Sequence, residues 1–323
     1  MKIFVTGTAG FIGSHLARRL LDEGDEVAGL DNFNDYYSVR LKRDRHALLE
    51  KYPQYQGHEL DLCDLPGMQR LVAEFRPECV VHLAAQPGVR YSLVNPQAYQ
   101  RSNLEGFLNV LECCRHAQPR PRLIYASSSS VYGDSREMPF AEEQRADAPL
   151  SLYAATKRAN ELMAHSYSHL FGLQAIGLRF FTVYGPWARP DMAVWQFAEA
   201  MLRGEAIRVF NHGDMRRDFT YIDDIVAGVT GCVRAATLPP CDVFNIGNHR
   251  SERLLDLIRL LARALGTGEP KMELLPMQDG DVPATYASVD RLRAAVGYEP
   301  TTPIEVGIPK FATWFKEYRR CAS

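Results

Sequence analysis

The sequence predicts an α/β protein with a doubly wound parallel sheet in the first part of the chain and a smaller α/β domain at the C-terminus. Two observations lead to this fold class. Up to about residue 180, short apolar runs typical of buried strands alternate with segments of helical periodicity. Beyond that point the alternation loosens, and the pairs Gly185-Pro186 and Arg189-Pro190 interrupt the chain, which indicates loops and shorter elements.

The expected strands are short apolar runs at residues 3–5, 27–30, 79–84, 123–126 and 174–179. After the first of them, Ile12, Leu16 and Leu20 recur at helical spacing. Further helices are expected over residues 96–117 and 153–171. Because successive strands are joined through helices, they run parallel, and the helices cover both faces of the sheet.

Composition argues against several kinds of partner. The formal net charge is −2 and the basic residues form no long block, so neither a nucleic acid nor a membrane surface is expected. No apolar stretch is long enough to span a bilayer, and no secretory signal is expected because the first strand begins at Lys2. The seven cysteines lack metal-ligand spacing, so we expect reduced thiols in a cytoplasmic protein and no metal site.

A glycine-rich loop over residues 6–13 joins the first strand to the first helix. Its glycines permit a tight turn and let backbone N–H groups approach a pyrophosphate, which the N-terminus of the helix also favours. A glycine trio alone is a weak signal, but its place between an apolar strand and an amphipathic helix is the context that a dinucleotide site requires. The expected contacts in this loop are Gly7, Gly10, Phe11, Ile12 and Gly13.

Asp31 ends the second expected strand. A carboxylate there accepts hydrogen bonds from the adenosine ribose and repels a 2′-phosphate, which favours NAD over NADP; the alternative is a simple turn residue. The other expected cofactor contacts also follow strands, and they are Asn32, Asp61, Leu62, Leu83, Ala84, Ala85 and Gln86. We therefore predict a Rossmann-type NAD-binding domain over 1–180, with return segments near 220–250, and a mainly substrate-binding domain over 181–323.

Tyr153 and Lys157 lie four residues apart at the start of an expected helix, so they share one face of it. An ammonium group beside a phenol lowers the phenol's pKa, which lets the phenolate act as a base near neutral pH. The lysine can also bind the nicotinamide ribose. Residues 127–130, four serines in a row, end the preceding strand. One of these hydroxyls can relay the proton of a reacting sugar hydroxyl. The alternative interpretation is a polar turn at the end of the strand, which would account for one serine but not for four.

With these motifs the chain resembles the extended short-chain dehydrogenase/reductases, and among them the nucleotide-sugar epimerases. The matching segments are residues 6–13, 31–32, 83–86, 127–133, 153–157, 179–186 and 217–224. Residues 87–92 and 189–192 resemble those of UDP-glucuronate 4-epimerases in particular. By position, Ser128 matches the catalytic serine or threonine of the family.

The resemblance implies a reaction and three catalytic residues, Ser128, Tyr153 and Lys157. Tyr153 removes the C4 hydroxyl proton of a UDP-sugar, the C4 hydride moves to NAD, the 4-keto sugar rotates, and the hydride returns to the other face. UDP-glucuronate would thus become UDP-galacturonate. The same resemblance implies a homodimer formed through the helices at 96–117 and 153–171.

Related enzymes divert the same intermediate, and they supply the alternatives. Sugar 4,6-dehydratases carry Asp-Glu at the positions of Ser129 and Ser130, and UDP-glucuronate decarboxylases carry glutamate at the position of Ser130. Because this chain has serines in place of those carboxylates, elimination and decarboxylation are both disfavoured. Galactose epimerases carry asparagine at the position of Thr182. Epimerases of UDP-glucose or UDP-N-acetylglucosamine, a related dehydratase or decarboxylase, and a non-enzymatic redox sensor remain the alternatives.

The expected UDP-sugar contacts follow from the same resemblance. Arg189 and Arg217 would serve the diphosphate, and the backbone edge and ring of residues 209–210 would serve uracil. Arg90 follows the fourth strand at the sheet edge where ligands bind, and it would serve the uronate carboxylate or the diphosphate. The full set is Pro87, Arg90, Ser127, Ser128, Ser129, Thr182, Arg189, Val209, Phe210, Arg217, Gln278 and Asp281.

Overall fold

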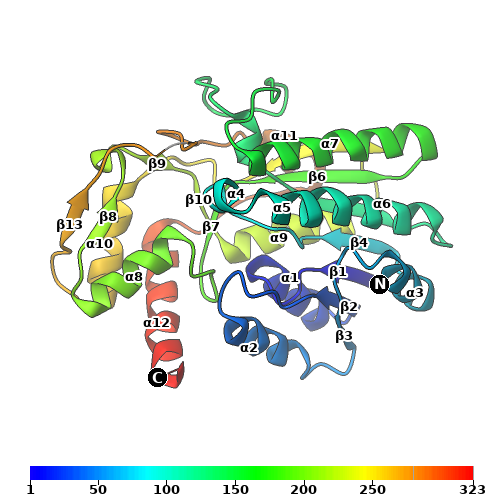
Figure 1. Ribbon diagram of the computed structural model, residues 1–323, viewed down its shortest axis with the longest axis horizontal. Coiled ribbons are helices and arrows are strands. Elements are labelled where there is room, and N and C mark those ends of the chain that lie inside the picture. The colour runs from blue at the N-terminus through cyan, green and yellow to red at the C-terminus, as the bar shows by residue number, and fades with distance from the viewer. Residues whose placement is uncertain (279, 323) are drawn as a thin grey trace.

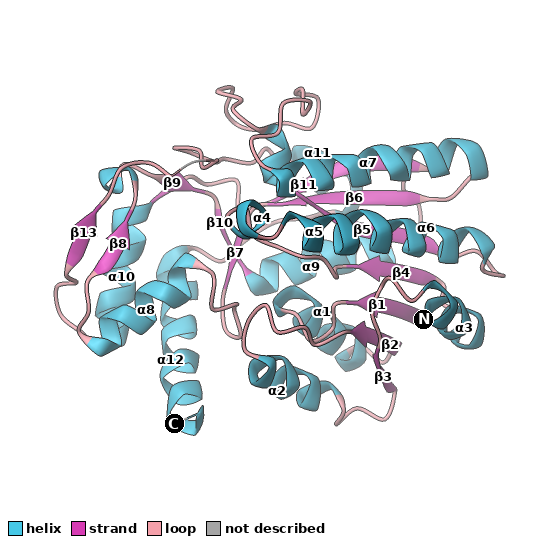
Figure 2. Ribbon diagram, in the orientation of Figure 1, coloured by secondary structure: helices cyan, strands magenta, loops and turns pink. Residues whose placement is uncertain are grey.

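A seven-stranded parallel sheet forms the centre of the computed structural model, which describes residues 1–278 and 280–322. The strand order is β11-β6-β5-β4-β1-β2-β3, so the direction of winding reverses between β1 and β4 (Figure 2). The strands are β1 (Lys2–Thr6), β2 (Glu26–Asp31), β3 (Tyr55–Glu59), β4 (Cys79–His82), β5 (Arg122–Ser128), β6 (Ala175–Phe180) and β11 (Cys241–Ile246). This arrangement confirms the predicted fold class.

The strand limits follow from burial and pairing. Most residues of β1, β4 and β6 are buried, as the continuous apolar runs require for a sheet covered on both faces. The strand expected over 79–84 is wrong at its end, because β4 stops at His82. There Leu83 donates its N–H to the Thr6 carbonyl and Ala84 donates to the Thr6 hydroxyl at 3.2 Å, which turns the chain across the end of β1.

Helices cover both faces of this sheet. α1 (Phe11–Asp22) packs beside α9 (Ile222–Arg234), and α3 (Leu65–Phe75), α6 (Gly106–His116) and α7 (Leu152–Phe171) pack together. Two apolar clusters of buried residues result, one for each group of helices. α2 (Val39–Leu49) lies against α1.

The helix expected over 96–117 is divided. It consists of α5 (Pro96–Tyr99), a π-helical segment η1 (Gln100–Glu105) and α6. Such π turns recur at functional sites because they change the direction of a side chain. Here the segment contains the buried Asn103. The short helix α4 (Tyr91–Val94) precedes it.

The second half of the chain supplies a smaller lobe beside the sheet (Figure 1). Its longer helices are α8 (Ala193–Arg203), α10 (Leu254–Leu265) and α12 (Ile304–Ala322), and α10 packs against both of the others. Three two-stranded sheets join β7 (Thr182–Tyr184) to β10 (Phe219–Tyr221), β8 (Ile207–Val209) to β13 (Met272–Leu274), and β9 (Arg216–Arg217) to β12 (Glu252–Arg253). The remaining short elements are η2 (Ser129–Tyr132), η3 (Asn211–Gly213) and α11 (Asp290–Val296).

The chain returns from the second half to the large sheet. β11 pairs with β6 in parallel register, with Phe244 opposite Leu178, and α9 supports the same sheet through α1. The domain limits 1–180 and 181–323 stay a prediction. Within the part of the chain that the structure describes, no helix has the length and apolar character needed to cross a membrane.

Candidate active site

A cavity of about 360 Å³ opens at the carboxyl ends of the central strands. This is the place where parallel α/β sheets bind ligands, at the reversal of strand order. It is lined by nearly all of the predicted cofactor contacts, namely Gly7, Gly10, Phe11, Ile12, Gly13, Asp31, Asn32, Asp61, Leu62, Leu83, Ala84, Ala85, Tyr153 and Lys157. Gln86 is not among the lining residues; it is buried beneath the cavity wall.

The glycine loop has the form that a pyrophosphate requires. Gly7 has a φ of +80°, and a Cβ there would lie 2.8 Å from the Ala84 nitrogen. At Gly13 a Cβ would lie 2.0 Å from the Gly7 carbonyl oxygen. Gly10 begins α1 without a capping side chain. The first N–H groups of this helix therefore have no side-chain acceptor and can bind an anion.

Asp31 lines the cavity at the carboxyl end of β2. Its carboxylate accepts hydrogen bonds from the backbone N–H groups of Ala9 at 3.0 Å and Phe33 at 2.9 Å. Burial raises the pKa of Asp31. Lys42, which sequence reasoning missed, also lines the cavity and donates to the Asn34 side-chain oxygen at 2.8 Å. Burial lowers the pKa of Lys42 to about 8.

Tyr153 and Lys157 lie one helical turn apart in α7, and Ser128 faces them from the end of β5. The Lys157 ammonium donates to the Ala126 carbonyl at 2.9 Å, and burial lowers the pKa of Lys157 to about 8. Burial raises the pKa of Tyr153, against the opposing effects of a Ser128 hydrogen bond and the Arg189 charge. The net direction is opposite to the lowering expected from Lys157, because burial outweighs the groups that lower the pKa of Tyr153.

The four consecutive serines have different environments. The Ser128 Oγ accepts hydrogen bonds from the Ser130 N–H at 3.2 Å and the Ser130 hydroxyl at 2.9 Å. Its own proton is thus left to donate toward the cavity. Ser127 also lines the cavity, but its hydroxyl donates to Glu161 at 2.6 Å. Ser129 is half-buried and is not among the lining residues.

Asn103 holds the chain behind the cavity, and sequence reasoning missed it. Its amide accepts from the Gln86 N–H at 2.8 Å and donates to the Gln86 carbonyl at 3.1 Å and to Thr156 at 3.0 Å. Its own carbonyl accepts from Asn160 at 2.6 Å. These bonds fix the segment after β4 against α7, and they explain why Gln86 is buried. The only feature of the sequence that could have pointed to Asn103 is that an asparagine lies inside an expected helix.

The predicted substrate contacts fall into two groups. Pro87, Thr182 and Arg189 line the cavity together with Ser127 and Ser128. The others lie outside its lining, and they are Arg90, Ser129, Val209, Phe210, Arg217, Gln278 and Asp281.

Outside the lining, the predicted contacts pair with one another. The Arg90 guanidinium lies 5.2 Å from the centre of the Phe210 ring, and Arg217 forms an ion pair with Asp281 at 2.6 Å. The Val209 carbonyl accepts from the Leu275 N–H at 2.8 Å, because β8 is paired with β13, and the contact of residues 209–210 with uracil stays a prediction. Of the loop at 277–283, Asp279 lies outside the described residues.

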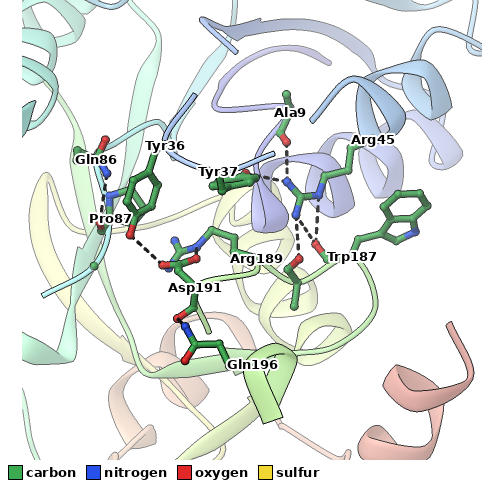
Figure 3. A network of polar contacts seen from close by, with 12 residues as sticks. Ala9, Tyr36, Tyr37, Arg45, Gln86, Pro87, Trp187, Arg189, Asp191 and Gln196 are labelled. Atoms are coloured by element: carbon green, nitrogen blue, oxygen red, sulfur yellow. Dashed lines mark hydrogen bonds and ion pairs between the residues drawn. The ribbon is translucent and has the colours of Figure 1, made fainter. Parts of the chain in front are cut away.

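An ion pair fixes Arg189 at the cavity wall. Its guanidinium donates to both carboxylate oxygens of Asp191, at 3.0 and 3.2 Å. The Tyr36 hydroxyl donates to the same carboxylate at 3.2 Å, as Figure 3 shows. Tyr36 belongs to the loop after β2 and Asp191 to the loop after β7, so this contact joins the two halves of the chain across the cavity.

Comparison with known proteins gives the class of the protein. Residues 3–247 match the NAD dependent epimerase/dehydratase family, and the chain belongs to this family. Within the described residues, no group of three or more His, Cys, Asp or Glu side chains could hold a metal ion. The family match indicates that the cavity binds NAD.

Three similar proteins narrow this class. Protein CapI of Staphylococcus aureus is 48% identical over 334 residues, which cover 98% of this chain and 99% of CapI. UDP-glucuronate 4-epimerase 2 of Arabidopsis thaliana is 45% identical over 332 residues, covering 98% of this chain and 76% of the plant protein. A crystal structure of UDP-glucuronic acid 4-epimerase from Bacillus cereus, with UDP-glucuronic acid and NAD, matches with a TM-score of 0.93 and 33% identity, covering 98% of this chain and 100% of that one.

Proposed function

We propose that this protein is an NAD-dependent UDP-glucuronate 4-epimerase that forms UDP-galacturonate. One observation carries the proposal: Tyr153, Lys157 and Ser128 meet at one end of a cavity whose other end is the glycine loop. The similarity to UDP-glucuronate 4-epimerases over nearly the whole chain supports the choice of sugar.

The residues that line the cavity suit a dinucleotide. The uncapped start of α1 offers N–H groups to a pyrophosphate, and Asp31 offers carboxylate oxygens to the adenosine ribose. Lys157 would contact the nicotinamide ribose. NAD held there would supply an acceptor for the C4 hydride, which it would return, and a positive charge on its oxidised ring.

The proton at the C4 oxygen passes to Tyr153. Only the phenolate of Tyr153 can accept this proton, and because burial raises the pKa of Tyr153, the donors around it must stabilise the phenolate near neutral pH. Ser128 is set to donate because its oxygen already accepts two hydrogen bonds from Ser130. It can donate to the phenolate before the transfer and to the sugar oxygen while the proton leaves. Lys157 is largely protonated at neutral pH, since its pKa is about 8, and it adds a positive charge to the same end of the cavity.

The sugar end of the cavity has hydroxyls and a cation but no free carboxylate among the described lining residues. The carboxylates that line the cavity, Asp31 and Asp61, follow β2 and β3, and β2 is separated from β5 by β1 and β4. An acid or base for elimination at C5 is thus lacking beside Ser128. Thr182 and Arg189 can bind the uronate carboxylate, whose burial without partners would cost several kcal/mol.

Decarboxylation is disfavoured by the same geometry. Hydroxyl donors can hold the carboxylate close to the plane of the keto-sugar ring in either rotational pose. There the C–C bond to the carboxylate overlaps poorly with the C4 carbonyl, so carbon dioxide leaves slowly. The expected product is the C4 epimer.

The test is to offer UDP-glucuronate, UDP-glucose and UDP-N-acetylglucosamine separately and to read the C4 configuration by NMR. We expect rapid equilibration of UDP-glucuronate with UDP-galacturonate, little use of the other two sugars, and no net NADH. Comparable rates on UDP-glucose would refute the uronate assignment. Stoichiometric NADH release would refute the epimerase itself.

We further propose that the enzyme is a cytoplasmic homodimer. Leu108 of α6 and Leu162 and Leu170 of α7 are exposed to 40%, 54% and 67%, and paired copies of these adjacent helices would bury them. All seven cysteines are unpaired, which suits a reducing compartment. Light scattering should give twice the chain mass, and Leu162→Glu should shift it toward the monomer; a wild-type monomer at micromolar concentration would exclude the dimer.

A further inference from the structure

Arg45 is a fully buried cation that forms no ion pair with a carboxylate at hydrogen-bond distance among the described residues. It belongs to α2, and 1% of its surface is exposed. All five N–H groups of its guanidinium donate hydrogen bonds. Nε and Nη2 donate to the Trp187 carbonyl at 3.1 and 2.6 Å, and Nη2 also donates to the Ala188 carbonyl at 3.1 Å. Nη1 donates to the Ala9 carbonyl at 2.9 Å and to the Tyr37 hydroxyl at 2.8 Å. Each acceptor is uncharged.

A buried cation in this position is costly. Apolar side chains of similar volume often replace buried charges without loss of stability. What an apolar side chain could not do is bind three carbonyl groups from two distant segments at once. The planar guanidinium is suited to that task. The position of Arg45 therefore points to a role in joining these segments.

The two segments belong to opposite sides of the cavity. Ala9 lies in the glycine loop, and Trp187 and Ala188 lie in the loop that carries Arg189 (Figure 3). Trp187 has a φ of +61°, a conformation that a tryptophan rarely adopts and that costs about 1–3 kcal/mol. Two of the Arg45 hydrogen bonds end on the carbonyl of this residue, so they help to hold the loop in that conformation.

We propose that Arg45 is a positioning residue for the epimerisation. It fixes the loop at 185–192 against the glycine loop, so that Arg189 stands at a set place relative to the cofactor and to Tyr153. The inference rests on the proposed function and adds to it a residue that touches neither ligand. Displacing the Arg189 loop by about 1 Å would lower turnover on the order of 100-fold.

The aromatic surroundings supply a readout that is independent of activity. The three tryptophans of the chain form one cluster: Trp187 and Trp195 both pack on Trp314 of α12, with ring centres 5.3 and 5.6 Å apart. Tryptophan emission therefore reports on the place of Trp187. If Arg45 anchors the loop, its loss should shift the emission to longer wavelength as this ring gains water.

The experiment compares Arg45→Lys and Arg45→Met with a matched control, Arg234→Met. Arg234 also joins distant segments, through Asp25 and Glu23 at 3.0 and 2.9 Å, and it lies outside the cavity lining. We expect both Arg45 variants to keep their bound NAD and to lose kcat on UDP-glucuronate by about 10- to 100-fold, with a red-shifted emission. The control should lose melting temperature only.

The possible results separate the hypotheses. A wild-type protein without epimerase activity would refute the proposed function, whatever the variants do. With an active wild type, folded Arg45 variants that keep kcat within about twofold would overturn the positioning role. Lost kcat with unchanged emission would also overturn it, since the loss would not pass through the loop. Failure of both Arg45 variants to fold would mean that Arg45 supports the fold itself, which again overturns the proposal.

Discussion

The ion pair between Glu161 and Arg179 lies directly behind the candidate catalytic serine, and its two partners should differ sharply in what their loss costs. Both side chains are nearly inaccessible, with 2% and 3% of their surface exposed. Glu161 accepts two bonds from Arg179, each of 2.9 Å, one from Ser127 at 2.6 Å and one from the less buried Arg158 at 2.7 Å. Glu161→Gln would leave the Arg179 charge without its counter-charge. Breaking a buried pair in this way costs about 3–5 kcal/mol.

A double variant tests whether the charge or the packing is responsible. Glu161→Leu combined with Arg179→Met removes both charges and keeps most of the volume, so we expect its free energy of unfolding to be within about 1 kcal/mol of the wild-type value. Urea unfolding of the wild type, both single variants and the double variant gives the coupling energy. The double variant also removes the acceptor of the Ser127 hydroxyl, so we expect its kcat to fall while the NAD content stays constant.

The pH dependence of this pair has a defined sign. Burial raises the pKa of Glu161, but the hydrogen bonds and charge of Arg179 outweigh it, and the net pKa is lowered from 4.5. The stabilisation is therefore fully present above pH 4.5 and is lost as the pH falls through the lowered value. The double variant should lack this acid-sensitive component. Equal stability of Glu161→Gln and the wild type at pH 7, or equal acid sensitivity of all four proteins, would refute the reasoning.

Three further predictions concern the reaction. Tyr153→Phe should keep its fold and bound NAD but lose turnover by about 10²–10⁴-fold; half of the wild-type activity would exclude Tyr153 as the base. Asp31→Ser should weaken the preference for NAD over NADP, because the carboxylate no longer repels a 2′-phosphate and Lys42 stands nearby; equal binding of the two by the wild type would contradict this role. The pH profile of kcat/KM should fall above pH 8 as Lys157, with a pKa of about 8, loses its charge, and a level profile up to pH 9.5 would exclude that dependence.

Much of the fold could be predicted because it depends on local patterns. The strand-loop-helix sequence at Thr6–Gly13 has both the apolar run and the glycines, and the structure has β1, the turn and α1 at these positions. The i, i+4 spacing of Tyr153 and Lys157 placed both on one face of α7, and both line the cavity. The parallel sheet then brought the ends of β1, β2 and β5 together. The roles of these residues stay predictions.

The residues that reasoning from the sequence missed act between distant segments. Asn103 meets Gln86 only because a π-helical segment turns it toward the chain after β4. Arg45 meets Trp187, which lies far along the chain, and its neighbours Arg40 and Arg43 in the same charged helix gave no reason to single it out. Charged residues on a helix usually face water. Only the three-dimensional structure shows which of them is buried.

The charges around the substrate side suggest how one site can bind and release sugars of equal charge. A UDP-uronate brings negative charge at its diphosphate and at C6. Arg189 and Arg217 are each already paired with a carboxylate, Asp191 and Asp281. These pairs hold each guanidinium in one orientation, so less side-chain entropy is lost on binding. The two carboxylates also reduce the net attraction of the arginines for the anionic sugar nucleotide, which favours release of the product. The C4 epimer is then expected to leave as readily as the substrate enters. Asp191→Asn should therefore lower the KM for UDP-glucuronate and slow product release, and stopped-flow displacement of bound UDP would measure it. A raised KM with unchanged release would show that Asp191 acts only by orienting Arg189.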